Sequence, residues 1–503
     1  MDRDGAKEFA KRERIRRLRR FIEDNMMTMA WVVSLLFFLV ILGNVQGSGT
    51  EHPGGFIFAL SYLAAALIAF VLSLRIKSDV RKRGDVALPV RRASCFLIPF
   101  AFTGNFFAAI AGFATVKKEK NLEYMLAYYS FLSTVMILIV SSLNLFKEKI
   151  SVSFWTGMAL LCLLILFYGI IIALVCRRTS AGGDYRKLFI PALLCLASGI
   201  TGNLFAVTLG LVILSRIRAL GKSQQPEWID VVRRVFRNYM SVIGLFIVVF
   251  LLSLSFCSFL TFDYAVAAEN NYSALKLHPS LMYPFGTDEF GRCIFTRIVF
   301  GARISLLIGF IATLVPLLVG GFLGAMAGHF SSVLDNVVMR ILDILYAVPD
   351  ILLAFAIVAA FGANTFNLIV ALSAGAIPSY ARTMRAQVMV VSSAEFVEAA
   401  RACGQSELMI LLKHIVPNAM APMIVRATLT IGSAVLSTSS LSFLGLGVQS
   451  HVPEWGNILK MGSTYLETHT YMALFPGLAI ILIVLAFNFF GDGLRDALDP
   501  KLK

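Results

Sequence analysis

The chain has 503 residues, of which 58% are hydrophobic, with a mean hydropathy of +0.78 and a net charge of +15. This apolar fraction excludes an ordinary soluble domain and indicates an all-α polytopic membrane protein. A membrane span needs about 20 mainly apolar residues, and on that basis we expect about twelve transmembrane helices. The positive charge is typical of loops held at the cytoplasmic face against anionic membrane lipid, so we predict no nucleic acid partner.

The first half of the chain begins with a basic stretch, residues 1–24, which we place in the cytoplasm. Residues 25–214 then form an N-terminal membrane region of about six spans. These spans are expected near 26–45, 55–74, 94–115, 125–145, 154–175 and 188–214. A polar and basic stretch, residues 215–241, follows as a cytoplasmic linker.

A short sequence is repeated within this region. Thr103-Gly104-Asn105 and Thr201-Gly202-Asn203 each follow a Leu-Ile-Pro or Phe-Ile-Pro sequence in the third and sixth segments. We therefore consider residues 25–115 and 125–214 as tandem copies, with chance similarity as the alternative. Three spans in each copy would give the copies opposite orientations.

The charges between the segments suggest a second topology. Six full spans would place the basic stretches around 117–120 and 177–187 outside the cell, against the positive-inside tendency. If the third and sixth segments were re-entrant hairpins, all these stretches would lie inside. We favour six full spans, because each segment is long enough to cross.

The second half, residues 242–503, carries six further apolar segments. They lie at about 242–260, 302–328, 335–361, 366–388, 423–444 and 471–490. A long outer loop, 261–300, contains a glycine-rich polar motif. Its residues of interest are Gly286, Thr287, Asp288, Gly291 and Arg292. Two interpretations are equally favoured: a self-satisfied turn, or a contact with a binding protein or the pore mouth.

Charged residues lie within the predicted spans, where a charge costs about 3 kcal/mol and normally faces the helix bundle or a cavity, and four of them are candidate site residues. Asp343 lies at the same depth as Arg382 and Arg385, so we favour an ion pair. Asp350 follows Pro349 and lies deeper, and it is a candidate for lining a pore and meeting a cationic group of a substrate.

A polar segment, residues 395–417, separates two apolar spans. Good helix formers begin it, Gly404 interrupts it, and an amphipathic run follows up to Pro417. The pattern predicts a helix, a glycine turn and a second helix. Its residues of interest are Glu398, Ala399, Ala400, Gly404, Ile415 and Pro417.

A second outer motif follows the next span. It comprises Pro453, Glu454, Trp455 and Gly456, after the sequence LSFLGLG. Trp455 suits the outer membrane interface, as part of an aromatic belt or as a lid.

These motifs occur in the order found in the permease subunits of bacterial ABC importers, and this half resembles the dipeptide, oligopeptide and nickel branch. The resemblance covers residues from about 228 to 503 and implies that six spans form a type I importer permease fold in the bacterial plasma membrane. It also implies that residues 395–417 are a coupling loop that docks on a cytoplasmic ATPase. The implied partners are a second homologous permease, two ABC ATPase subunits and an extracytoplasmic solute-binding protein.

The chain has no Walker A phosphate-binding loop, so we expect no bound cofactor and no enzyme activity of its own. Seven scattered cysteines without a CxxC pair, and six scattered histidines, suggest no metal site. By resemblance the solute is a peptide or a related solute such as nickel, and pairing with an identical or a different permease is open. The alternative is an ion-driven secondary carrier with twelve spans, in which the membrane acids would relay protons.

Overall fold

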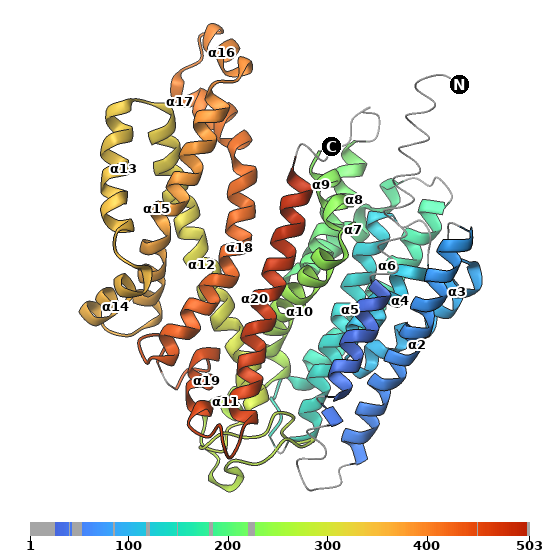
Figure 1. Cartoon of the computed structure of the whole chain (residues 1–503). Coiled ribbons are helices and arrows are strands. Elements are labelled where there is room, and N and C mark those ends of the chain that lie inside the picture. The colour runs from blue at the N-terminus through green and yellow to red at the C-terminus, as the bar shows by residue number, and fades with distance from the viewer. Residues whose placement is uncertain are drawn as a thin grey trace, which may run out of the picture. The chain divides into compact units, whose positions relative to one another are not determined.

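The computed structural model describes residues 26–39, 41–42, 53–83, 86–116, 121–147, 149–180, 185–219, 227–449 and 451–499. The chain divides into two compact units. The N-terminal unit comprises Met1–Ser142, Met158–Pro226 and Phe236–Tyr239, and the C-terminal unit comprises Leu143–Gly157, Glu227–Val235 and Met240–Lys503. The basic stretch 1–24 lies outside the described residues, as does part of the linker 215–241. Apart from one isolated β-bridge between Thr287 and Cys293, the regular secondary structure of the described residues is helical in both units (Figure 1).

The N-terminal unit has two halves with the same order of elements. The first half contains the helix Met26–Leu39, α2 (Pro53–Arg83), α3 (Leu88–Ala93), the 3-10 helix η1 (Ser94–Thr103) and α4 (Phe106–Val116). The second half contains α5 (Leu122–Ser142), α6 (Phe154–Ser180), η3 (Tyr185–Leu188), α7 (Phe189–Ala197), η4 (Ser198–Thr201) and α8 (Leu204–Arg218). Each half is therefore two helices followed by a broken helical segment.

The break in each half falls at the repeated Thr-Gly-Asn sequence. Gly104 and Gly202 adopt left-handed backbone conformations, with φ of 81° and 78°, which favour glycine. The next residue starts a new helix: Asn105 accepts a hydrogen bond from the Ala108 N–H at 3.1 Å, and Asn203 accepts one from the Ala206 N–H at 3.3 Å. Asparagine is a favoured cap at a helix N-terminus, so the sequence itself specifies the break.

Beyond each break the chain turns back along the segment that it has just left. A Cβ atom added to Gly112 of α4 would lie 2.7 Å from the carbonyl oxygen of Ser94 in η1. A Cβ atom added to Gly210 of α8 would lie 2.8 Å from the carbonyl oxygen of Ala192 in α7. The two legs thus pack backbone against backbone, and residues 94–116 and 188–218 are hairpins rather than single continuous helices.

Each hairpin is also tied to the first helix of its own half. The Asn105 side-chain amide donates to Ser34 Oγ at 2.8 Å, and the Asn203 amide donates to the carbonyl oxygen of Ser130 at 3.2 Å. Asn105 and Asn203, which occupy equivalent positions, thus each donate a hydrogen bond to a serine in the first helix of their own half.

The C-terminal unit contains η2 (Leu143–Phe146), the first turn of α6, and the chain from α9 onwards. Its further elements are α9 (Glu227–Val235), α10 (Tyr239–Thr261), α11 (Ala265–Ala268), η5 (Tyr272–Ala274), α12 (Ile294–His329), α13 (Ser332–Tyr346), α14 (Asp350–Phe361), α15 (Thr365–Ser392), α16 (Glu395–Ala402), α17 (Glu407–Ile410), the π-helical turn η6 (Leu411–Ile415), α18 (Val416–Phe443), α19 (Trp455–Ser463) and α20 (Tyr471–Leu498). In this unit α16 and α17 lie at one end, and α11 and α19 lie at the other (Figure 1).

Helix α12 runs through this unit and packs closely on α15. Gly320, Gly324 and Gly328 recur every four residues and so share one face of α12. A Cβ atom added to Gly324 would lie 2.2 Å from the carbonyl oxygen of Ala381 in α15. Small residues at this spacing let two membrane helices approach until their backbones touch.

Fewer helices of the described residues than the expected twelve or so are long and apolar enough for a full span, and Met26–Leu39 is a shorter apolar helix. Seven helices are long and apolar enough to cross a membrane, and the bent pair α13 and α14 makes an eighth. Two of the predicted spans, 94–115 and 188–214, correspond to the hairpins 94–116 and 188–218. The predicted span 335–361 is bent by 82° between α13 and α14, where Pro349 disfavours helical backbone in the residue before it. The all-α polytopic fold itself is as predicted.

Candidate functional site: the coupling hairpin and the outer motif cluster

The segment 395–417 has the helix, glycine turn and helix that its sequence predicts. Helix α16 ends before Gly404, whose φ of 80° reverses the chain. Ser406 then accepts a hydrogen bond from the Met409 N–H at 3.4 Å and starts α17. We call residues 395–417 the coupling hairpin.

One face of the coupling hairpin is buried. Val397, Ala400, Ile410 and Ile415 pack in a cluster with residues of α12, α15 and α18. Ala400 and Ile415, two of the predicted site residues, therefore hold the hairpin on the unit rather than presenting it to a partner. Their burial stabilises the hairpin through the loss of apolar surface from water.

The opposite face is exposed and partly apolar. Phe396, Leu408 and Met409 are 44%, 56% and 52% exposed. The predicted site residues Glu398, Ala399, Gly404 and Pro417 are also exposed. A surface that carries exposed large apolar side chains beside polar ones is typical of a protein interface.

An ionic cluster fixes the shape of the coupling hairpin. The Arg401 guanidinium contacts both carboxylate oxygens of Glu407, at 2.6 and 3.0 Å, and so bridges the glycine turn. Glu407 Oε2 also lies 2.9 Å from His329 Nε2 at the end of α12. No prediction from the sequence named this cluster. The opposite charges of Arg401 and Glu407 on either side of Gly404 were a usable signal for the first contact, but nothing marked His329.

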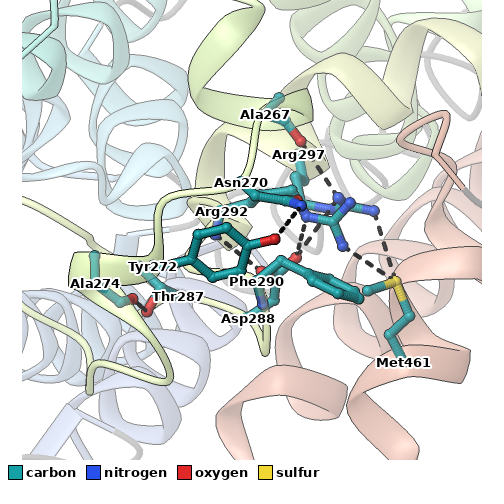
Figure 2. A network of polar contacts seen from close by, with 10 residues as sticks. All are labelled: Ala267, Asn270, Tyr272, Ala274, Thr287, Asp288, Phe290, Arg292, Arg297 and Met461. Carbon is teal, nitrogen blue, oxygen red and sulfur yellow. Dashed lines mark hydrogen bonds and ion pairs between the residues drawn. The ribbon is translucent and has the colours of Figure 1, made fainter.

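The first outer motif forms a buried, internally bonded turn (Figure 2). Asp288 Oδ1 accepts hydrogen bonds from the backbone N–H groups of Phe290 and Arg292, both at 2.9 Å. Its Oδ2 accepts one from Arg292 Nε at 2.8 Å and lies 3.5 Å from Arg297 Nη1. Asp288 is 3% exposed. Of the two interpretations of this motif, the geometry favours the self-satisfied turn.

The glycines and the threonine of this motif serve the same turn. Gly286 and Gly291 have φ of 77° and 74°. Thr287 Oγ1 donates to the Ala274 carbonyl oxygen at 2.5 Å (Figure 2). It also accepts a hydrogen bond from the Leu277 N–H at 2.7 Å. The motif thus closes the loop before α12 by using positions where glycine is favoured.

The second outer motif is buried as well. Glu454, fully buried, caps α19 by accepting from the Asn457 N–H at 3.1 Å. Its other oxygen accepts from Ser305 of α12 and Ser439 of α18, at 3.2 and 3.1 Å. This carboxylate therefore ties three helices together at one point.

Trp455 was expected to form part of an aromatic belt or a lid, and the structure instead buries it against other helices. Its side chain is fully buried, and its indole N–H donates to the Ile298 carbonyl oxygen of α12 at 2.9 Å. Gly301 of α12 leaves room for this approach, because a Cβ atom there would lie 2.9 Å from Trp455 Cδ1. Gly456 lets the motif approach α18 in the same way, since a Cβ atom there would lie 2.2 Å from the Ser439 carbonyl oxygen. Pro453 is buried beside them. The motif packs helices together instead of forming a belt or a lid.

The charged residues of the predicted spans separate into pairs. Asp343 accepts a hydrogen bond from Arg382 at 2.7 Å, which is the ion pair that the sequence favours. Arg385 was expected beside the same carboxylate. It instead makes a bidentate contact with Asp335, in which its Nε and Nη2 each lie 2.5 Å from a carboxylate oxygen. Asp350 lies exposed in the first turn of α14.

Comparison with known proteins identifies relatives of this chain. Residues 320–503 match the family described as the binding-protein-dependent transport system inner membrane component. The chain is 43% identical over 277 residues to the dipeptide transport system permease protein DppC of Alkalihalophilus pseudofirmus, covering 55% of this chain and 90% of that protein. It is 40% identical over 282 residues to the glutathione transport system permease protein GsiD of Pectobacterium atrosepticum, covering 56% of this chain and 94% of that protein.

Among solved structures, the inward-facing MetNI methionine ABC transporter is similar at 20% identity with a TM-score of 0.35, covering 40% of this chain and 96% of that chain. The extent and identity of the match to the permease relatives establish the family. The chain belongs to the binding-protein-dependent transport permeases, and it is a multi-pass permease subunit of an ABC importer in the bacterial plasma membrane, a transport component rather than an enzyme.

Proposed function

We propose that this permease carries peptides into the cell and that the coupling hairpin is its docking site for a cytoplasmic ATPase. The observation that carries the docking role is the division of the hairpin into two faces. The buried face, including Ala400, is anchored on three long helices, and the exposed face presents Phe396, Leu408 and Met409. A movement of the hairpin is transmitted to the helices beneath it, because closely packed protein interiors have low compressibility.

The proposed assembly contains a second permease, identical or homologous, two ATPase subunits and an extracytoplasmic solute-binding protein. The second permease is supported by the apolar surface of α13, where Val337, Ile341 and Ile344 are 53%, 63% and 74% exposed. Transport then proceeds by alternating access, which requires that ATP, substrate and partners bind the inward-facing and outward-facing states with different affinity.

Peptides are the proposed solute because the two permease relatives are named for dipeptide and glutathione transport. Asp350 supports this choice, since an exposed carboxylate near the bend between α13 and α14 suits the amino group of a peptide. Because the chain belongs to the permeases of ABC importers, we set aside the alternative of an ion-driven secondary carrier. Nickel uptake without peptide uptake would overturn the peptide assignment and leave the family unchanged.

The docking role is tested by purifying the tagged permease in mild detergent and measuring which ATPase accompanies it. Glu398→Lys and Gly404→Pro change the exposed face and the turn, so both are expected to abolish co-purification and uptake while the permease still inserts into the membrane. The matched control is Glu269→Lys, the same charge reversal at an exposed glutamate of the outer loop. Normal ATPase binding in both hairpin variants would refute the docking role.

A further inference from the structure

Residues 143–157 belong to the C-terminal unit, although the chain on either side of them belongs to the N-terminal unit. They comprise η2, the connection to α6 and the first turn of α6. We call them the strap. At most 56% of the chain is matched by the two permease relatives, and the family match begins only at residue 320, so the strap comes from the part of the chain that precedes the recognised permease.

The strap caps the end of α10. The Asn144 side-chain amide donates to the Thr261 carbonyl oxygen at 2.9 Å, and Ser153 Oγ donates to the Leu260 carbonyl oxygen at 3.1 Å. Carbonyl groups in the last turn of a helix have no partner within that helix, so they need one from elsewhere. Gly157 allows the approach, since a Cβ atom there would lie 2.9 Å from Leu260 Cβ.

A buried lysine joins the same segment to α12. Lys147 is 8% exposed, and its Nζ donates to Thr296 Oγ1, in the first turn of α12, at 2.5 Å. The amine also lies over the rings of Phe262 and Phe295, 5.4 and 5.7 Å from their centroids. An amine is costly to bury without partners, and cation–π contacts offset part of that cost.

The surroundings of Lys147 act on the pKa of its amine in two opposite directions. Burial lowers the pKa of its amine, and the nearby Cys293 and Asp263 act in the opposite direction. Lys147 and the groups around it belong to the strap, the start of α12 and the loop after α10. The contact between Lys147 and α12 therefore lies within one end of the C-terminal unit.

This contact decides between the two topologies of the N-terminal region. Helix α12 has 36 residues, so its ends lie on opposite faces of the membrane, and its far end contacts the coupling hairpin at Glu407. With the coupling hairpin in the cytoplasm, as in the proposed function on which this step rests, Thr296 and the strap lie outside. Helix α5 ends at the strap and is long enough to cross, so its start at Leu122 lies inside. Six full spans would place the strap inside.

We propose that the N-terminal region crosses the membrane four times, that its two hairpins enter from the cytoplasmic face, and that the strap docks outside on the ends of α10 and α12. The two halves then have two crossings each and run in the same direction, not opposite directions. All the basic stretches of this region become cytoplasmic, in agreement with the positive-inside rule. Among the described residues, those that move inside are Arg177, Arg186 and Lys187.

The topology is tested by single-cysteine labelling in a background that lacks the native cysteines. Val152→Cys in the strap, Asn121→Cys and Arg186→Cys are all exposed positions. A membrane-impermeant maleimide added to intact spheroplasts is expected to label position 152, and to label positions 121 and 186 only after permeabilisation. The reverse pattern would establish six full spans and overturn the proposal.

One further position separates failure of this proposal from failure of the proposed function. A variant that retains only Cys403, which is exposed in the coupling hairpin, is expected to be labelled only after permeabilisation. Labelling of Cys403 from outside would refute the cytoplasmic coupling hairpin. If Cys403 and position 152 are both protected in intact spheroplasts, the coupling role stands and the strap proposal is wrong.

Docking of the strap is tested with Lys147→Met and Asn144→Ala, and Lys149→Met is the control because Lys149 is exposed in the same segment. Both strap variants are expected to lower the thermal midpoint of the purified transporter by several degrees relative to the control. A variant that retains only Cys293, which is fully buried beside the strap, gives a second measurement. Adding Lys147→Glu should make Cys293 react with maleimide from outside. Midpoints equal to the control, or an unreactive Cys293, would refute docking.

Discussion

Replacement of Asp288 by asparagine separates a structural from a transport role for the first outer motif. Asparagine keeps one oxygen that can accept the Phe290 and Arg292 N–H groups. It replaces the oxygen that faces the Arg292 guanidinium by an amide NH2 group, and it removes the negative charge. The side chains of Asp288, Arg292 and Arg297 are 5%, 6% and 0% exposed, so both buried arginines would lose the carboxylate that lies against them.

The expected loss follows from this burial. Removing one partner of a buried ion pair typically costs about 3–5 kcal/mol, because the remaining charge is left without compensation. A domain of this size loses about 2 °C of thermal midpoint per kcal/mol, so the midpoint should fall by about 6–10 °C. Glu289→Gln is the matched control: it is the neighbouring carboxylate, it is partly exposed, and it should leave the midpoint within about 1 °C, as for an ordinary surface substitution.

The assay is thermal unfolding of the detergent-purified transporter, monitored by size-exclusion chromatography, together with peptide uptake in cells. Because membrane proteins often unfold irreversibly, both variants must be heated at the same rate as the native chain. We expect Asp288→Asn to lose stability, and to lose uptake in proportion to the amount of folded protein. An unchanged midpoint with abolished uptake would refute the structural interpretation and favour contact with a binding protein or the pore mouth.

Three further outcomes are expected. Gly324→Leu should prevent assembly of the permease, because its side chain would meet the Ala381 carbonyl of α15; recovery of normal amounts of monodisperse protein would contradict the close packing. Glu454→Ala should lower stability by about 2–4 kcal/mol, since it removes a helix cap and leaves two buried hydroxyl groups without their acceptor, and a midpoint equal to that of the native chain would argue against this role. Asp350→Asn should reduce uptake of peptides with a free amino group more than uptake of N-acetylated peptides, and equal uptake of both would remove Asp350 from substrate binding.

The sequence predicted local features well. The apolar runs, the helix, turn and helix around Gly404, and the Asp343–Arg382 pair all depend on residue types at short spacing or at equal depth. The family also followed from motif order, because the motifs occupy turns and caps that only a few residues can form.

What sequence reasoning could not supply was the path of the chain between segments. An apolar run of about 20 residues is compatible with a full span or with a hairpin, and the choice at Gly104 depends on which backbone faces Gly112. The burial of Trp455 depends on residues 157 positions away at Ile298, and the capping of α10 by Asn144 spans 117 positions. Contacts of this range leave no periodic signal in a single sequence.

The length of α12 has a mechanical consequence. At about 1.5 Å per residue, its 36 residues form a rod about 54 Å long. Its outer end carries Arg297 and supports Trp455, its last three turns bear the glycine face against α15, and its inner end meets Glu407. If such a rod tilts by about 5° about one end, the other end moves by about 5 Å. A displacement of an angstrom or two at the coupling hairpin is thus enough to shift the outer cluster by a comparable distance without breaking a backbone hydrogen bond.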